Sequence, residues 1–148
     1  MPIPRRLTLA AYALAAAGLL AALGGCATNP VTGRSDIVTM SEAQEIELGR
    51  KMHPQILQQY GRYSDEALQA YVNDIGQRIA KVSHLPNLQF TFTVLDSPDI
   101  NAFALPGGYI YITRGILAHL GSEAQLAGVL GHEIGHVTAR HSAQRITQ

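Results

Sequence analysis

Apolar residues follow a helical period in three parts of the chain. The clearest part begins after Ser64, the expected N-cap, and its apolar residues share one face of a helix. They are Leu68, Tyr71, Val72, Ile75, Ile79 and Val82. A second helix is expected from Ser41 to about Met52, and Pro54 either kinks it or starts another short one. A third helix follows the Ser122 cap and is predicted by a stripe of Leu126, Leu130, Ile134 and Val137.

The hydrophobic period changes to two between the helical pattern that follows Ser64 and the one that follows Ser122. Alternation in 88–94 is typical of a half-buried strand, with Leu88, Phe90, Phe92 and Val94 facing inward. Residues 109–113 alternate again after Pro106-Gly107, a pair that predicts a type II turn because the third turn position needs a positive φ. We therefore expect a hairpin or a bent strand connection. The fold class is α+β, mostly helical, with a small sheet or hairpin beside the third helix.

That third helix contains His132-Glu133-Ile134-Gly135-His136, the HExxH spacing. Residues four apart lie on one face of an α-helix, so the two imidazoles can hold one metal ion between them. Glu133 lies beside that face, where a general base for a water molecule is required. The alternative is a pair of solvent-facing histidines on an ordinary helix. We interpret His53 as a surface or capping residue and His84 as a loop residue.

Three glycines, Gly128, Gly131 and Gly135, form a stripe next to the two histidines. Each glycine costs about 1 kcal/mol relative to alanine in a helix interior. We therefore expect another backbone element to pack closely against the stripe. Simple tolerance of small residues is the alternative.

The chain has 148 residues, with 11 Lys+Arg against 11 Asp+Glu, so no charge excess favours nucleic acid as a partner. Its start is different in character: Arg5-Arg6 precede an uncharged apolar run, a secretory signal pattern. The run ends in Leu23-Gly24-Gly25-Cys26, which resembles the lipobox of bacterial lipoproteins. A retained membrane anchor is the alternative, although the Ala-rich run is short for a span.

The lipobox resemblance implies removal of residues 1–25 as a signal peptide and lipidation of Cys26, the single cysteine. Residues 26–40 then form a lipidated tether. Ala27, rather than aspartate, follows the cysteine, and similarity to Gram-negative sorting signals favours an outer membrane lipoprotein facing the periplasm.

Two segments, 101–115 and 126–145, resemble the zinc metallopeptidases of family forty-eight, which includes the HtpX heat-shock protease and the CAAX prenyl protease. The lipoprotein start is similar to the bacterial periplasmic branch. This resemblance implies a zincin-like (gluzincin) fold with one zinc ion, His132 and His136 as zinc ligands, and Glu133 as catalytic base. It also implies protein quality control in the envelope, with unfolded or misassembled envelope proteins as substrates.

Members of that family take a third zinc ligand from a glutamate on a downstream helix, yet no acidic residue follows Glu133 here. His141 lies about 140° from His136 around a helix, so it cannot join the same ion unless the helix breaks. We therefore interpret 41–148 as the N-terminal part of a peptidase domain, which binds zinc weakly and is inactive alone. If a third ligand lies within the chain, the first candidates are Glu123, Asp96 and Asp99.

The predicted function is a zinc-dependent metalloendopeptidase that hydrolyses peptide bonds with an activated water. A strand before a metal-binding helix lets an extended peptide add alongside it through backbone hydrogen bonds. The residues expected to contact substrate are Asn101, Ala102, Phe103, Tyr109, Ile110 and Tyr111. The alternative is a non-catalytic lipoprotein chaperone or binding module with a degenerate metal site, which the missing ligand favours.

Overall fold

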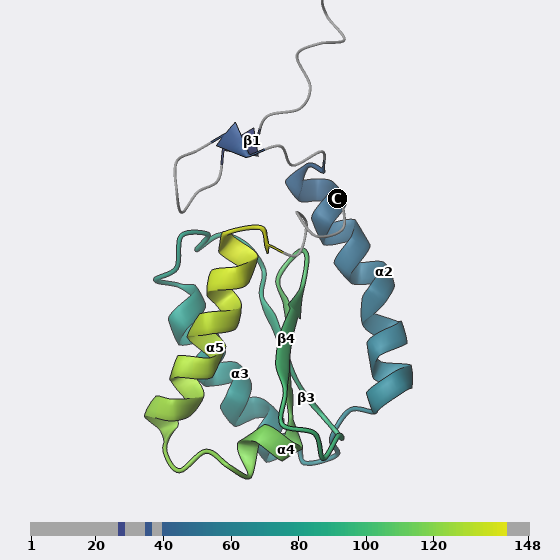
Figure 1. Cartoon of the computed structure of the whole chain (residues 1–148), viewed down its shortest axis with the longest axis vertical. Coiled ribbons are helices and arrows are strands. Elements are labelled where there is room, and N and C mark those ends of the chain that lie inside the picture. The colour runs from purple at the N-terminus through teal and green to yellow at the C-terminus, as the bar shows by residue number, and fades with distance from the viewer. Residues whose placement is uncertain (1–26, 29–34, 37–39, 142–148) are drawn as a thin grey trace, which may run out of the picture.

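A computed structural model describes residues 27–28, 35–36 and 40–141 (Figure 1). The expected signal peptide and Cys26 lie outside these residues, and so does most of the expected tether. The short strands β1 (Ala27–Thr28) and β2 (Ser35–Asp36) pair antiparallel. Within the described part, no helix is both long and apolar enough to cross a bilayer.

The remaining elements form an α+β fold of helices around a small sheet, as predicted. In chain order they are α2 (Glu42–Tyr60), α3 (Glu66–Ala80), β3 (Thr91–Leu95), β4 (Ala102–Leu105), β5 (Tyr109–Thr113), α4 (Arg114–Leu117) and α5 (Glu123–Thr138). The strand order is β3-β5-β4, with β5 parallel to β3 and antiparallel to β4. The predicted hairpin is therefore β4–β5. Its turn contains Gly107 at φ 78°, the positive φ that a type II turn requires.

Helices cover both faces of the sheet. Figure 1 shows α3 and α5 on one side and α2 on the other. The larger core, between the sheet and α3 and α5, includes Val72, Ile75, Phe92, Val94, Ile110, Ile112, Leu130 and Ile134. A smaller core joins Leu95, Leu105 and Tyr111 to α2. Phe92 and Val94 face the larger core as predicted, but Thr93 and Leu95, which point to the other face, are buried as well. The prediction of a half-buried strand was therefore wrong.

The helix limits follow the predicted caps closely, with two corrections. Ser122 accepts a hydrogen bond from the Gln125 backbone N–H, as a cap should, but α3 is capped by Asp65 instead of Ser64. Helix α2 continues through Pro54 to Tyr60. Met52, Ile56 and Leu57 pack against the smaller core on both sides of the proline. Their burial offsets the hydrogen bond that proline cannot donate.

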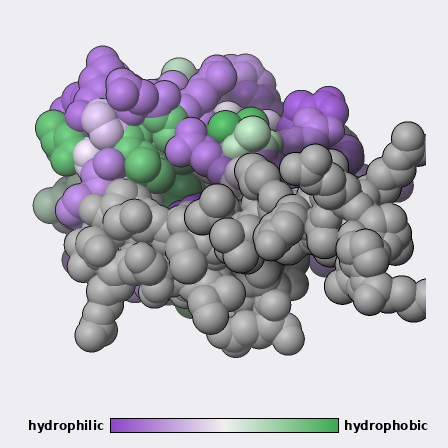
Figure 2. Space-filling model, turned by 90° about the horizontal axis from the view of Figure 1, so that it is seen from above, coloured by the Kyte–Doolittle hydropathy of each residue, from purple (hydrophilic) through white to green (hydrophobic). Residues whose placement is uncertain are grey.

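The outer surface is mostly hydrophilic where the view from above leaves it uncovered (Figure 2). In the described residues, the large apolar side chains that are exposed are Ile46, Tyr71, Val82 and Ile100. Tyr71 and Val82 were expected on the inner face of α3. Tyr71 is 45% exposed, because α3 turns a narrower face toward the core than the sequence pattern predicted. Val82 is 85% exposed and lies beyond the end of α3 at Ala80.

A side chain from α3 closes the outer edge of β3. The Gln69 amide donates to the carbonyl oxygens of Val94 (2.9 Å) and Tyr63 (2.8 Å). In return, the Val94 N–H donates to Gln69 Oε1 at 2.9 Å. Gln69 is only 6% exposed, so this amide takes the place of a further strand in the buried edge of the sheet.

We expect Gln69→Ala to lower the free energy of unfolding by about 2–4 kcal/mol, because the Val94 N–H and two carbonyls lose a buried partner. Urea unfolding followed by circular dichroism measures the change. Gln58→Ala, at an exposed glutamine of α2, is the matched control and should change stability by less than about 0.5 kcal/mol. Equal effects of the two substitutions would contradict the role given to Gln69.

Candidate metal centre

Helix α5 places the two motif histidines side by side. The ring centroids of His132 and His136 are 4.5 Å apart, and their planes are nearly perpendicular. A zinc–nitrogen bond is about 2.0–2.1 Å long, which puts the centroid of a ligating imidazole about 3 Å from the ion. Two rings that share one ion therefore have centroids less than about 6 Å apart. The observed separation fits two ligands of a single ion.

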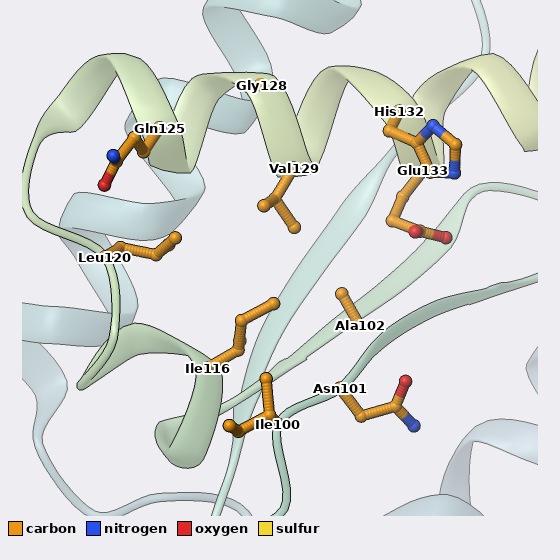
Figure 3. Close-up of a pocket in the computed structure, with 10 residues that line it drawn as sticks. All are labelled: Ile100, Asn101, Ala102, Ile116, Leu120, Gln125, Gly128, Val129, His132 and Glu133. Atoms are coloured by element: carbon orange, nitrogen blue, oxygen red, sulfur yellow. The ribbon is translucent and has the colours of Figure 1, made fainter.

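Glu133 lies next to this pair but is differently placed. His132 is exposed, whereas Glu133 is only 7% exposed. Both side chains lie at one end of a cavity of about 570 Å³ (Figure 3). A carboxylate that is partly shielded from solvent and adjacent to the histidines is suitably placed to accept a proton from a water in the cavity.

Three acidic residues were suggested as a third ligand, and the structure places all of them in other interactions. Glu123 accepts hydrogen bonds from Tyr71 and Arg78. Asp96 pairs with Arg114, and Asp99 accepts a hydrogen bond from Ser97. Residues 40–141 contain no cluster of three His, Cys, Asp or Glu that could hold a metal. The described donor set fits two of the three protein ligands of a catalytic zinc.

His141 reaches the second histidine because the helix does break. Helix α5 ends at Thr138, and Arg140 adopts a left-handed conformation with φ 59°. The chain then turns back, and Nδ1 of His141 lies 2.8 Å from Nδ1 of His136. One of these nitrogens donates and the other accepts. In the tautomer in which Nδ1 of His136 donates, Nε2 of His136 carries the lone pair that a metal ligand needs. His141 therefore orients the imidazole of a candidate ligand.

The turn after α5 is held by a buried ion pair that sequence analysis missed. The Arg140 guanidinium donates to Glu45 Oε1 and to the carbonyl oxygen of Met40 (2.6 Å). Burial raises the pKa of Glu45, while its hydrogen bond and ion pair with Arg140 oppose that rise. The pair joins the C-terminal end of α5 to the first turn of α2. It fixes the end of the helix that carries His136.

The residues expected to contact substrate divide into two groups. Asn101 and Ala102 line the cavity with His132 and Glu133. The other four belong to the core or to the opposite side of the sheet, and they are Phe103, Tyr109, Ile110 and Tyr111. None of these four side chains lines the cavity, so their expected contact with substrate stays a prediction. An alternating strand pattern does not reveal that a second helix covers the other face.

Tyr111 is the most deeply buried of these four residues. It is completely buried, and its hydroxyl is 2.7 Å from Nδ1 of His53 on α2. Burial raises the pKa of Tyr111 and lowers the pKa of His53. His53, which was expected at the surface or in a cap, therefore joins α2 to the central strand.

The glycine stripe lacks the close backbone neighbour that was expected among the described residues. A Cβ built on Gly128 or Gly135 would meet no described atom within 4 Å, and one on Gly131 would meet only the Ile79 side chain at 3.9 Å. No described backbone element packs against the stripe, so that hypothesis was wrong. Gly128 instead borders the cavity.

Comparisons with known proteins agree with this site. The family model described as peptidase family M48 matches residues 66–148, which include α3, the sheet and α5. The chain is 38% identical over 85 residues to a putative beta-barrel assembly-enhancing protease of Vibrio cholerae serotype O1, covering 57% of this chain and 18% of the relative.

Two further relatives are similar. The beta-barrel assembly-enhancing protease of Escherichia coli K12 is 33% identical over 117 residues, covering 79% of this chain and 24% of the relative. A mitochondrial metalloendopeptidase OMA1 of Arabidopsis thaliana is 45% identical over 69 residues, covering 47% of this chain and 14% of the relative. The chain thus spans about a quarter or less of the length of these relatives.

We expect His141→Phe to weaken metal binding at the His132–His136 pair by about tenfold to a hundredfold, because His136 loses the partner that orients it. Titration of the purified chain with zinc against a chromogenic chelator measures the affinity. His84→Phe, at an exposed loop histidine, is the control and should leave it unchanged. An unchanged affinity in His141→Phe would show that His136 is oriented by other contacts.

Proposed function

The chain belongs to peptidase family M48, and on this basis we propose that it provides catalytic residues of a zinc-dependent metalloendopeptidase of the zincin type. One observation carries the proposal: His132 and Glu133 lie at one end of a cavity that Asn101 and Ala102 also line. This arrangement brings one candidate ligand, a candidate base and an edge strand together, and His136 lies beside His132.

His132 and His136 are the zinc ligands in this proposal. When bound, zinc polarises a peptide carbonyl and makes a water molecule more acidic. Glu133 accepts a proton from the attacking water and delivers it to the leaving amine. His141 accepts a hydrogen bond from Nδ1 of His136 and so favours the tautomer whose Nε2 carries a lone pair. The third protein ligand is supplied from outside the described residues, as the glutamate of a downstream helix in the family implies.

Strand β4 holds the substrate. It is an edge strand of the described three-stranded sheet, and β5 occupies its inner side. An extended peptide placed along it uses backbone hydrogen bonds, which do not depend on sequence. Such binding suits unfolded or misassembled envelope proteins, and the names of the beta-barrel assembly-enhancing relatives support this substrate class. Lipidation at Cys26 holds the domain at the periplasmic face of the outer membrane.

A binding module with a degenerate metal site is the second candidate function. It is favoured by one observation, that the described residues contain no three-ligand cluster. Measurements on Glu133 and His132 separate the two functions, because a binding module needs neither residue.

In a full-length version that supplies the third ligand, we expect Glu133→Gln to retain zinc but to lower casein cleavage by about 10²–10⁴, since the amide cannot accept the proton. His132→Ala should lose both zinc and cleavage. Zinc content after dialysis and casein cleavage are measured on that version, whereas the 148-residue chain is expected to bind zinc weakly and to show no cleavage. Zinc loss in Glu133→Gln equal to that in His132→Ala would instead make Glu133 a ligand. Cleavage at the wild-type rate in both variants would contradict the enzyme proposal.

The lipid anchor has a separate test. We expect Cys26→Ala to abolish palmitate labelling and to move the protein out of the membrane fraction, because the thiol is the site of lipid attachment. Labelling and fractionation of cells expressing each form measure both effects. Unchanged labelling and membrane recovery would mean that the apolar run is a retained anchor.

A further inference from the structure

Four segments that are far apart in the sequence meet at one end of the domain. The turn between β4 and β5 packs on the start of α2, because a Cβ on Gly107 would lie 2.5 Å from Cα of Ile46. The loop between α3 and β3 contacts the same turn, since a Cβ on Gly108 would lie 2.7 Å from the carbonyl oxygen of Gln89. The end of α5 joins them through the ion pair of Arg140 with the first turn of α2. This is the upper end of the molecule in Figure 1, and it is called the upper end below.

Apolar side chains lie open to solvent at the upper end. Of the four large apolar side chains that are exposed in the described residues, Val82 and Ile46 are here, 85% and 38% exposed. In the same loop as Val82, Pro86 is exposed, and Leu85 and Leu88 are half-buried. Figure 2 views the molecule from this end and shows apolar areas among the hydrophilic ones. Exposed apolar side chains that gather on one face mark a surface that contacts a partner.

The shape and charge of the loop 81–90 favour a lipid bilayer as that partner. Val82 stands out from the surface just beyond the end of α3, and the soft interface of a bilayer can surround such a protruding apolar group. The loop contains no acidic residue, and Lys81 beside Val82 is exposed. A lysine lays its apolar stem on an apolar surface while its ammonium stays among polar groups, here the lipid phosphates. Glu42, at the start of α2, is an exposed acidic residue of the same end, so the attraction to anionic lipid is local to the loop.

The expected tether enters the domain at this same end. Met40 follows Cys26 by 14 residues, so even a fully extended chain keeps Met40 within about 50 Å of a bilayer that is attached at Cys26. Surfaces that are linked by a short flexible chain meet at an effective concentration of about millimolar. A weak contact by one loop is then enough to select an orientation. A retained apolar run would also enter through Met40, so the upper end faces the bilayer in either case.

We propose that the upper end is a membrane-contact surface, and that Val82, Pro86 and the stem of Lys81 lie in the interface of the bilayer to which the tether is attached. This contact rests on the membrane attachment given under the proposed function. His136 lies near the upper end, because α5 ends at Thr138, two residues later. The contact therefore holds the candidate metal centre close to the bilayer, and the substrates within reach are segments that emerge at the membrane surface.

Tryptophan fluorescence tests the contact, because the chain contains no tryptophan of its own. Val82→Trp places one reporter in the full chain, which is purified with its membrane attachment and incorporated into vesicles of phosphatidylethanolamine and phosphatidylglycerol. We expect the emission to shift to shorter wavelength. We also expect lipids brominated near the headgroup to quench it more than lipids brominated at the chain end, since interfacial contacts lie only about 5–10 Å deep. Gln58→Trp, at an exposed position near the other end of α2, is the matched control and should show neither effect. Unquenched emission from Val82→Trp, or equal quenching of both variants, overturns the proposal.

A pair of charge variants tests the role of Lys81. Lys81→Glu, made in the Val82→Trp chain, should lower the ratio of quenched to unquenched protein by about fivefold or more, the effect of one charge near an anionic bilayer surface. Arg62→Glu makes the same change of charge at an exposed residue, which pairs with Leu95 at the opposite end of the sheet, and should leave the ratio unchanged. Equal effects of the two substitutions would show that only the net charge of the chain matters, and would remove Lys81 from the surface.

The same reporter distinguishes other partners of this surface. A shift of the Val82→Trp emission that occurs without vesicles and grows with protein concentration would mean that a second copy covers the loop. A shift without vesicles that is independent of concentration would mean that another part of the same chain covers it. Either result overturns the proposal. Palmitate labelling and casein cleavage, measured on a full-length version, test the anchor and the peptidase separately, because quenching of Val82→Trp requires neither lipidation of Cys26 nor a bound metal.

Discussion

The apolar stripe of α5 against the sheet is the contact on which the candidate site depends. Leu126, Leu130, Ile134 and Val137 are at most 5% exposed and fix the rotation of the helix about its axis. Glu133 lies three residues after Leu130 and four before Val137, so it borders the stripe and is largely buried. The two histidines lie farther round the helix, where His132 is exposed and His136 is half-buried. One helix rotation therefore sets both the exposed ligand positions and the shielded base.

The sheet gives this helix a fixed support because its two edges differ. At β3, Gln69 and Tyr63 satisfy the outward backbone groups of Val94. The central strand β5 is covered on both faces, and so its residues serve the core. This leaves β4, at the opposite edge, as the strand that borders the cavity through Ala102. The proposed substrate contacts therefore lie at that edge.

Local chemistry made parts of this arrangement predictable. The Ser122 cap, the α5 stripe and the Pro106-Gly107 turn depend on neighbouring residues, and all three were confirmed. The parallel pairing of β3 with β5 and the passage of α2 through Pro54 depend on packing between distant segments. The alternating pattern of 109–113 could not distinguish a strand with one solvent-exposed face from a strand that helices cover on both faces. Substrate roles were therefore assigned to Ile110 and Tyr111, which are core residues.

His141 shows how a distant contact can decide the composition of a site. The sequence calculation for this residue assumed that α5 continues, in which case the imidazole points away from His136. The helix instead ends at Thr138, and Arg140 turns the chain with a positive φ. A positive φ is unfavourable for a non-glycine residue and persists where other contacts hold it. Those contacts come from Glu45, 95 residues earlier. An ion pair to the first described helix thus brings His141 to the candidate ligand.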